Sequence, residues 1–91
     1  MTAPDDALAR ALAALCLEGR GMYRRPRLAF LGDLRAILPG DHPALALGDD
    51  ALEDACYAVR EHLAEAYGVL FGSMKNGRGT CRRLGVRLIR R

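Results

Sequence analysis

Residues 58–79 read AVREHLAEAYGVLFGSMKNGRG, and this stretch carries the strongest fold signals in the chain. A helical pattern ends at Gly68, the residue type best suited to the left-handed backbone that commonly follows a helix. Residues 69–71 are apolar and suited to a strand. The dipeptide Asn76-Gly77 then indicates a hairpin, for which we expect a type I′ turn with positive φ at both residues. The stretch therefore predicts a helix followed directly by a β-hairpin.

The helix that ends at Gly68 is predicted over residues 51–67. Asp50 and Glu53 have the spacing of a capping box, so we expect Asp50 to be the N-cap residue. Apolar side chains recur on one face of this helix: Leu52, Cys56, Val59 and Leu63. Such spacing is typical of an amphipathic helix packed against a core.

The predicted hairpin has one strand within residues 69–74 and a second within residues 80–89. In the second strand apolar and basic residues alternate, which is typical of a sheet with one packed face and one exposed face. The hairpin is therefore expected to present a basic surface.

The N-terminal half is predicted to supply two more helices and a short strand. The first helix runs from about Pro4 to Glu18, with Leu8, Leu12 and Leu15 on its buried face. Their spacing of four and three residues places these leucines on one side of the helix.

Residues 20–27 form a basic connector without an acidic residue. Pro26 excludes a helix through this connector, and residues 28–30 are expected to form a short strand. A second helix is predicted from position 31 or 32 to position 38, with this buried face: Leu31, Leu34, Ile37 and Leu38. The predicted order is helix, short strand, helix, helix and hairpin, in one α+β domain spanning residues 1–91.

The composition is that of a small globular domain. The chain has 91 residues, 51% of them hydrophobic, which suffices for one core. No apolar run approaches the roughly 18 residues of a membrane-spanning helix, and the first residues lack the basic region of a signal peptide. Cys16, Cys56 and Cys81 have no metal-ligand spacing. We therefore expect free thiols in a reducing cytoplasm, and we expect Cys16 and Cys56, which fall among helical apolar residues, to pack as small apolar side chains.

Charge is divided unevenly along the chain, although the formal net charge is only +3. Residues 1–65 hold seven arginines and all eleven acidic residues, which gives 7 − 11 = −4. Residues 66–91 hold six arginines and Lys75 with no acidic residue, which gives 6 + 1 = +7. A basic end on a small domain favours a polyanionic partner.

The predicted element order resembles that of the winged helix-turn-helix superfamily. Residues 58–73 resemble the end of the third helix entering the first wing strand, and residues 76–79 (NGRG) resemble the wing turn. The resemblance implies a DNA-binding fold of three helices followed by a C-terminal β-hairpin. It also implies that residues 51–67 form the DNA-reading helix and that residues 73–83 form the wing.

The predicted reading helix is acidic, which departs from this resemblance. It holds one basic residue, Arg60, against four acidic residues: Glu53, Asp54, Glu61 and Glu65. Duplex DNA carries one negative charge per roughly 1.7 Å of its axis, so it would repel this helix. The chain also has no Gln and only one Asn, the side chains that read adenine. We therefore expect contacts to phosphates and the minor groove rather than base reading.

The candidate nucleic-acid contacts come from the connector, the third helix and the wing: Arg24, Arg25, Arg27, Arg60, Lys75, Asn76, Arg78, Arg82 and Arg83. Guanidinium groups suit phosphate oxygens and narrow minor grooves. The expected partner is double-stranded DNA, and the resemblance implies a small bacterial or phage regulator of transcription or of a mobile element. A homodimer is also expected, because one module of this size buries little DNA surface.

An enzyme is not expected, because the chain has neither an HExxH motif nor a P-loop. No metal, cofactor, membrane or small-molecule ligand is evident as a partner. The alternative function is a protein-interaction module, a small inhibitor or adaptor that presents the acidic helix or the basic hairpin to a partner protein. Connector and wing arginines on opposite faces would disfavour a single DNA footprint.

Overall fold

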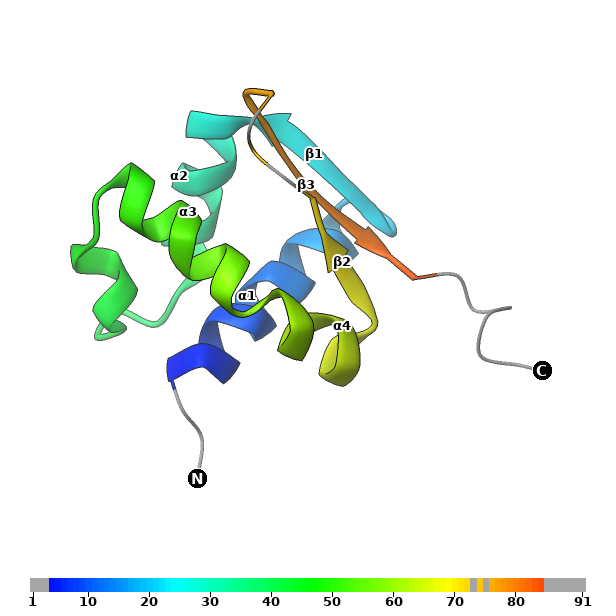
Figure 1. Ribbon diagram of the computed structural model, residues 1–91, viewed down its shortest axis with the longest axis horizontal. Helices are drawn as coiled ribbons and strands as arrows, with labels where there is room; N and C mark the ends of the chain where they lie inside the picture. The colour runs from blue at the N-terminus through cyan, green and yellow to red at the C-terminus, as the bar shows by residue number, and fades with distance from the viewer. Residues whose placement is uncertain (1–3, 73, 75, 85–91) are drawn as a thin grey trace.

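The computed structural model describes residues 4–72, 74 and 76–84 (Figure 1). In chain order its elements are α1 (Pro4–Glu18), β1 (Met22–Pro26), α2 (Arg27–Ile37), the 3-10 turn η1 (Pro43–Ala46), α3 (Asp49–Ala58), α4 (Arg60–Tyr67), β2 (Val69–Phe71) and β3 (Arg78–Arg83). The predicted α+β class is confirmed, but this part of the chain has four α-helices where three were predicted. None of its helices is long and apolar enough to cross a lipid bilayer.

The three strands form one antiparallel sheet in the order β1-β3-β2. Burial alternates along β2 and β3, with Val69, Phe71 and Cys81 buried. Helices α1, α2 and α4 contact the strands, and Figure 1 shows the helices gathered on one side of the sheet. The sheet therefore has an inner face toward the helices and an outer face toward solvent.

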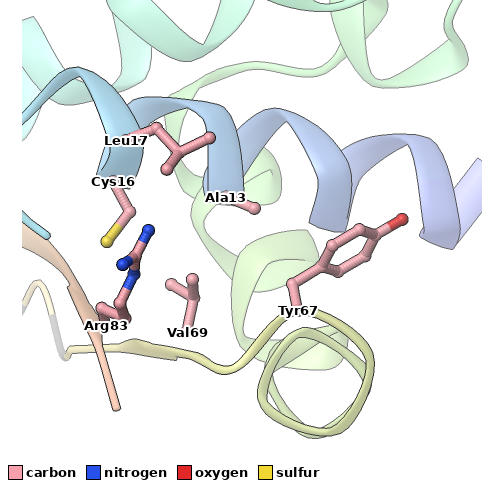
Figure 2. Close-up of a pocket in the computed structure, with 6 residues that line it drawn as sticks. All are labelled: Ala13, Cys16, Leu17, Tyr67, Val69 and Arg83. Carbon is pink, nitrogen blue, oxygen red and sulfur yellow. The ribbon is translucent and has the colours of Figure 1, made fainter. Parts of the chain in front are cut away.

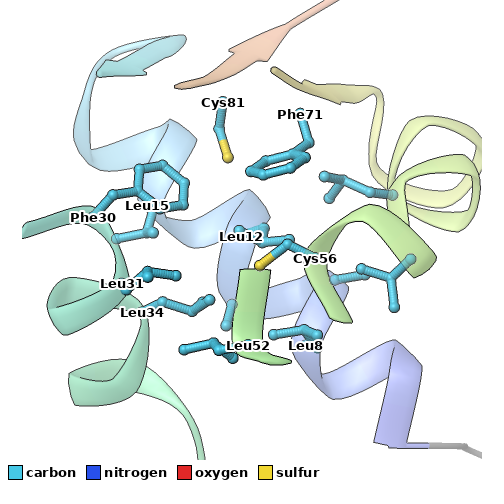
Figure 3. Close-up of a cluster of buried hydrophobic side chains, with 14 of the residues drawn as sticks. Leu8, Leu12, Leu15, Phe30, Leu31, Leu34, Leu52, Cys56, Phe71 and Cys81 are labelled. Atoms are coloured by element: carbon cyan, nitrogen blue, oxygen red, sulfur yellow. The ribbon is translucent and has the colours of Figure 1, made fainter. Parts of the chain in front are cut away.

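The core lies between the inner face and the helices (Figure 3). The predicted extent of α1 is confirmed, and its three leucines are buried. Phe30 of α2 packs against Phe71 of β2, with ring centroids 6.1 Å apart. A Cβ atom at Gly79 of β3 would lie 2.5 Å from Cγ of Phe30. Only glycine therefore fits at this point of the inner face without displacement of the ring.

All three cysteines are free and buried, which confirms the prediction made for Cys16 and Cys56. Cys56 and Cys81 are fully buried in the apolar cluster. Burial raises the pKa of the Cys56 thiol to about 12 and raises the pKa of the Cys81 thiol further. These thiols therefore stay protonated and act as small apolar side chains.

The secondary structure of the connector and of the segment after it differs from the prediction. Residues 22–26 of the connector form β1, whereas residues 28–30 belong to α2, so the strand predicted there is wrong. Four of the five residues of β1 are exposed, so the strand lacks an apolar alternation. Its extended state depends on pairing with β3. Ile37, predicted to be buried, is 39% exposed, whereas Leu38 just beyond the helix end is buried.

The single helix predicted over residues 51–67 is divided at Val59. This residue has φ −99° and ψ 4°, outside helical geometry, yet its side chain is buried. The apolar spacing passes through the break unchanged, so the sequence pattern did not reveal it. The break lets α3 contact α2 while α4 packs along α1.

The predicted C-terminal cap of the divided helix is confirmed, whereas its predicted N-terminal cap is wrong. Gly68 has φ 64° and caps α4, as predicted. At the other end Gly48, not Asp50, is the N-cap residue of α3, and no side chain caps the helix. The Asp50 and Glu53 carboxylates instead bind Arg27, as described below.

The predicted hairpin is confirmed as β2 and β3, and positions 85–89 of its second strand lie outside the described residues. The predicted type I′ turn centred on Asn76 and Gly77 is wrong, because the hydrogen bond that closes the turn ends at Gly77, which has φ 88°, instead of one residue later. The amide of Gly77 donates to the Met74 carbonyl at 3.0 Å. The Asn76 side-chain oxygen accepts from the amide of Arg78 at 3.2 Å. The Asn76 side chain thus binds the backbone just beyond the turn.

A polar cluster centred on Asp6 joins α1 to α4. Asp6 Oδ1 accepts from the Tyr67 hydroxyl at 2.9 Å and lies 2.9 Å from Nε2 of His62. Asp6 Oδ2 accepts from Nη2 of Arg10 at 3.1 Å. The hydrogen bonds with His62 and Tyr67 lower the pKa of the Asp6 carboxyl.

Candidate nucleic-acid interface

Three arginines from two strands share the outer face of the sheet. Arg78 and Arg82 of β3 project to this face, because the alternation along the strand directs Cys81 into the core. Arg24 of β1 is opposite Thr80 of β3 in the strand register, so both side chains lie on the same face. We call Arg24, Arg78 and Arg82 the outer-face arginines.

The outer-face arginines form a short row of unpaired positive charge. Arg78 and Arg82 are four positions apart in one strand, which separates their Cα atoms by about 13 Å. Arg24 lies beside Thr80, midway between them. All three are exposed, and within the described ranges none of their side chains forms an ion pair or a hydrogen bond.

One end of the outer face is also apolar. The register places Met22 of β1 and Leu70 of β2 on either side of Arg82. These side chains are 49% and 41% exposed. This end of the face therefore offers an arginine between two accessible apolar side chains.

Arg25, the sequence neighbour of Arg24, lies on the helix side of β1. Its Nη1 is 3.3 Å from Oδ2 of Asp33 in α2 and 3.4 Å from the Tyr23 hydroxyl. The Tyr23 hydroxyl itself donates to the same carboxylate oxygen. This hydrogen bond raises the pKa of Tyr23. The charge of Arg25 is therefore balanced within the fold.

Arg27 joins three elements at the start of α2. Its Nε donates to Glu53 at 2.6 Å and its Nη2 donates to Asp50 at 2.7 Å, both in α3. Its backbone amide donates to the Gly77 carbonyl at 2.7 Å, in the turn between β2 and β3. The hydrogen bond that Arg27 donates to Glu53 contributes most to raising the pKa of Arg27. Arg27 thus holds the turn and α3 against α2.

None of the remaining predicted contacts that the structure describes lies on the outer face. Arg60 begins α4 and is exposed. Arg83 ends β3 on the side toward α1, where it lines a hollow with Cys16. Asn76 is used by the turn, and Lys75 lies outside the described residues. The structure therefore brings together three of the nine predicted contacts.

The acidic character of the third helix persists after its ion pairs are counted. Asp49 lies 2.8 Å from Arg35 of α2, and two other carboxylates of α3 bind Arg27. In the described part of the chain the exposed Asp54, Glu61 and Glu65 have no such partner. The helices that would read bases therefore keep a negative surface.

The grouping of the outer-face arginines could not be found by sequence reasoning alone. Arg24 is far from Arg78 and Arg82 in the chain, and only the pairing of β1 with β3 brings them together. The one available signal was the absence of acidic residues from both segments.

Comparison with known proteins gives no relative for this arrangement. No family model, curated protein or solved structure matches the chain.

Proposed function

We propose that the protein binds double-stranded DNA through phosphate contacts from its outer-face arginines, Arg24, Arg78 and Arg82. The observation that carries the proposal is that these three exposed guanidinium groups share one face without an acidic partner among the described residues. Guanidinium groups form paired hydrogen bonds with phosphate oxygens, and DNA binding gains from release of the counterions those phosphates hold.

The order of elements supports a winged-helix reading of the fold, because a helix, a strand, further helices and a hairpin follow one another as in that superfamily. The role of a small transcriptional or mobile-element regulator rests on this resemblance. The acidic surface of α3 and α4 argues against insertion of these helices into the major groove. The contacts we propose are therefore to the backbone and carry little sequence information.

Duplex DNA is favoured over a single strand because the outer face of the described strands has no aromatic side chain on which bases could stack. Proteins that bind single strands commonly stack bases on aromatic side chains. Among the described residues, Tyr23 and Phe71 of the sheet are on the inner side and pack against Phe30. The outer face therefore offers charge and flexible apolar side chains but no stacking platform in the described strands.

The test is a titration of a labelled mixed-sequence duplex at several salt concentrations. Three phosphate contacts predict a log–log salt slope of about −2.7, at about 0.9 per contact. The double variant Arg78→Gln/Arg82→Gln should reduce the magnitude of the slope by about 1.8. The matched variant Arg10→Gln/Arg60→Gln removes the same charge from the helices and should leave the slope nearly unchanged.

Two outcomes would contradict the proposal. The first is the absence of binding at low salt, and the second is an equal loss of binding in both double variants. An equal loss would mean that net charge, not the outer face, attracts DNA.

Met22 and Leu70 support a second candidate function, which is binding of a protein partner. Two accessible apolar side chains beside Arg82 fit a partner surface that combines acidic and apolar residues. The double variant Met22→Ser/Leu70→Ser separates the two functions. Phosphate binding should survive this change, whereas a partner that uses the apolar side chains would lose most of its affinity.

A further inference from the structure

A hollow lies on the helix side of the sheet, between α1, the end of α4 and the ends of β2 and β3. Its volume is about 140 Å³, and Figure 2 shows the side chains that line it: Ala13, Cys16, Leu17, Tyr67, Val69 and Arg83. This volume is below the usual range for drug-sized ligands, so the hollow suits a small molecule.

The walls of the hollow are apolar except at one point. Val69 and Cys16 are buried, and burial raises the pKa of the Cys16 thiol. The Tyr67 hydroxyl is directed to Asp6 and does not serve the hollow. The remaining polar group is the guanidinium of Arg83, which Figure 2 shows turned toward Cys16 on α1.

Arg83 has no acidic partner in the described part of the chain. A guanidinium above an apolar hollow complements a molecule with a planar anionic end and an apolar tail. A carboxylate matches the two parallel N–H groups of the guanidinium, and an alkyl tail matches the walls.

We propose that this hollow binds a small apolar monocarboxylate, with its carboxylate on the Arg83 guanidinium and its tail against Ala13 and Val69. The site is separate from the outer-face arginines, because Arg83 lies on the helix side of β3. Carboxylate binding at this hollow can therefore be tested independently of DNA binding at the outer face.

A second hollow in the same molecule provides an internal comparison. It has a volume of about 200 Å³, lies between α1 and the end of α2, and is lined by Ala7, Arg10, Ala11, Ala14, Ile37 and Pro39. It also combines apolar walls with one arginine, but Arg10 is bound to Asp6 at 3.1 Å. Because that charge is already neutralised, the larger hollow is not expected to select a carboxylate.

The experiment is a titration of the ¹⁵N-labelled protein with straight-chain carboxylates of increasing length, from butyrate to octanoate, followed by amide chemical shifts. Saturable shifts are expected at Ala13, Cys16, Val69 and Arg83, with a dissociation constant on the order of 1 mM for the best ligand. Each added methylene should strengthen binding by up to about fourfold until the hollow is full. The alcohol of matching length should bind at least about tenfold more weakly.

Four variants make the test specific to Arg83. Arg83→Gln should weaken carboxylate binding by about tenfold or more, whereas Arg83→Lys should retain part of it. Arg10→Gln, at the second hollow, should leave binding unchanged. Ala13→Leu should fill the space for the ligand's alkyl tail while leaving Arg83 in place. Unperturbed amide signals distant from the hollow will confirm that each variant is folded.

The proposal is overturned if the wild-type protein gives no saturable shifts, or if the alcohol binds as well as the carboxylate. It is also overturned if Arg83→Gln keeps full affinity, or if the shifts map to Ala7, Ala14 and Ile37 instead. Weaker binding in Arg83→Gln would support the placement of the carboxylate on Arg83. Blocked binding in Ala13→Leu would support the placement of the tail against Ala13.

Discussion

Arg24 and Arg25 are adjacent and exposed in β1, yet they differ in the face of the sheet they occupy and in their partners. Arg24 points to the outer face and is unpaired among the described residues, whereas Arg25 points to α2 and contacts Asp33. The same contrast separates the outer face as a whole from the helix side, where the carboxylates of α2 and α3 neutralise several arginines. A count of basic residues therefore overstates the charge that the protein offers to a ligand.

The sharpest test of this contrast concerns packing. Gly79→Ala would place a Cβ atom 2.5 Å from Phe30 on the inner face. We expect the free energy of unfolding to fall by about 3 kcal/mol, because the ring is fixed within the core. Urea denaturation measures this change. Arg78→Ala, one position away on the outer face, should change it by about 0.5 kcal/mol or less; equal effects would contradict the two-faced description of β3.

The next test compares two arginines that sequence analysis treated alike. Arg27→Gln removes the bonds to Asp50 and Glu53 and loosens α3 from α2. We expect the melting temperature to fall by roughly 5 °C, against about 1 °C for Arg24→Gln, as thermal denaturation followed by circular dichroism will measure. In the DNA titration the order should reverse, with Arg24→Gln reducing the salt slope and Arg27→Gln, when folded, leaving it intact. A larger thermal effect of Arg24→Gln would exclude the structural role of Arg27.

The smallest expected effect depends on pH. The hydrogen bonds with His62 and Tyr67 lower the pKa of Asp6 below its ordinary value of 3.8. A lowered pKa in the folded state stabilises the protein above that ordinary value, and this contribution is lost as pH falls through the folded-state value. Asp6→Asn should therefore melt roughly 3 °C below the wild type near neutral pH, and the difference should close in acid.

The outer face supplies the control for this pH series. Arg82 has no carboxylate partner among the described residues, so the effect of Arg82→Gln should be the same at each pH. A difference between Asp6→Asn and wild type that stays constant from neutral pH into acid would show that the Asp6 carboxylate charge is not what joins α1 to α4.

Local signals predicted those parts of the fold whose cause is local. The leucine spacing of α1 and the stop at Gly68 need no information from elsewhere in the chain, and both are confirmed. The strand β1 was missed because its extended state comes from pairing with β3, not from its own alternation. The break at Val59 was missed because the buried spacing continues through it.

In the candidate site, too, locally determined features could be predicted and features that depend on distant segments could not. The sequence predicts the basic hairpin, but the partners of each arginine depend on contacts between distant segments. Asp50 and Glu53 have capping-box spacing, yet both are bound by Arg27, which lies much earlier in the chain at the start of α2. Arg83 was grouped with the DNA contacts, whereas the end of β3 places it at a hollow with α1.

The pairing of β1 with β3 also has a consequence for how the protein is made. The register joins Met22 to Arg82, which follows it much later in the chain, so the sheet closes only after β3 has left the ribosome. Such long-range pairing slows folding relative to contacts between neighbouring segments. A chain that lacks β3 or is unfolded therefore cannot display the row of outer-face arginines, and an activity that depends on this row requires β1 and β3 to be paired.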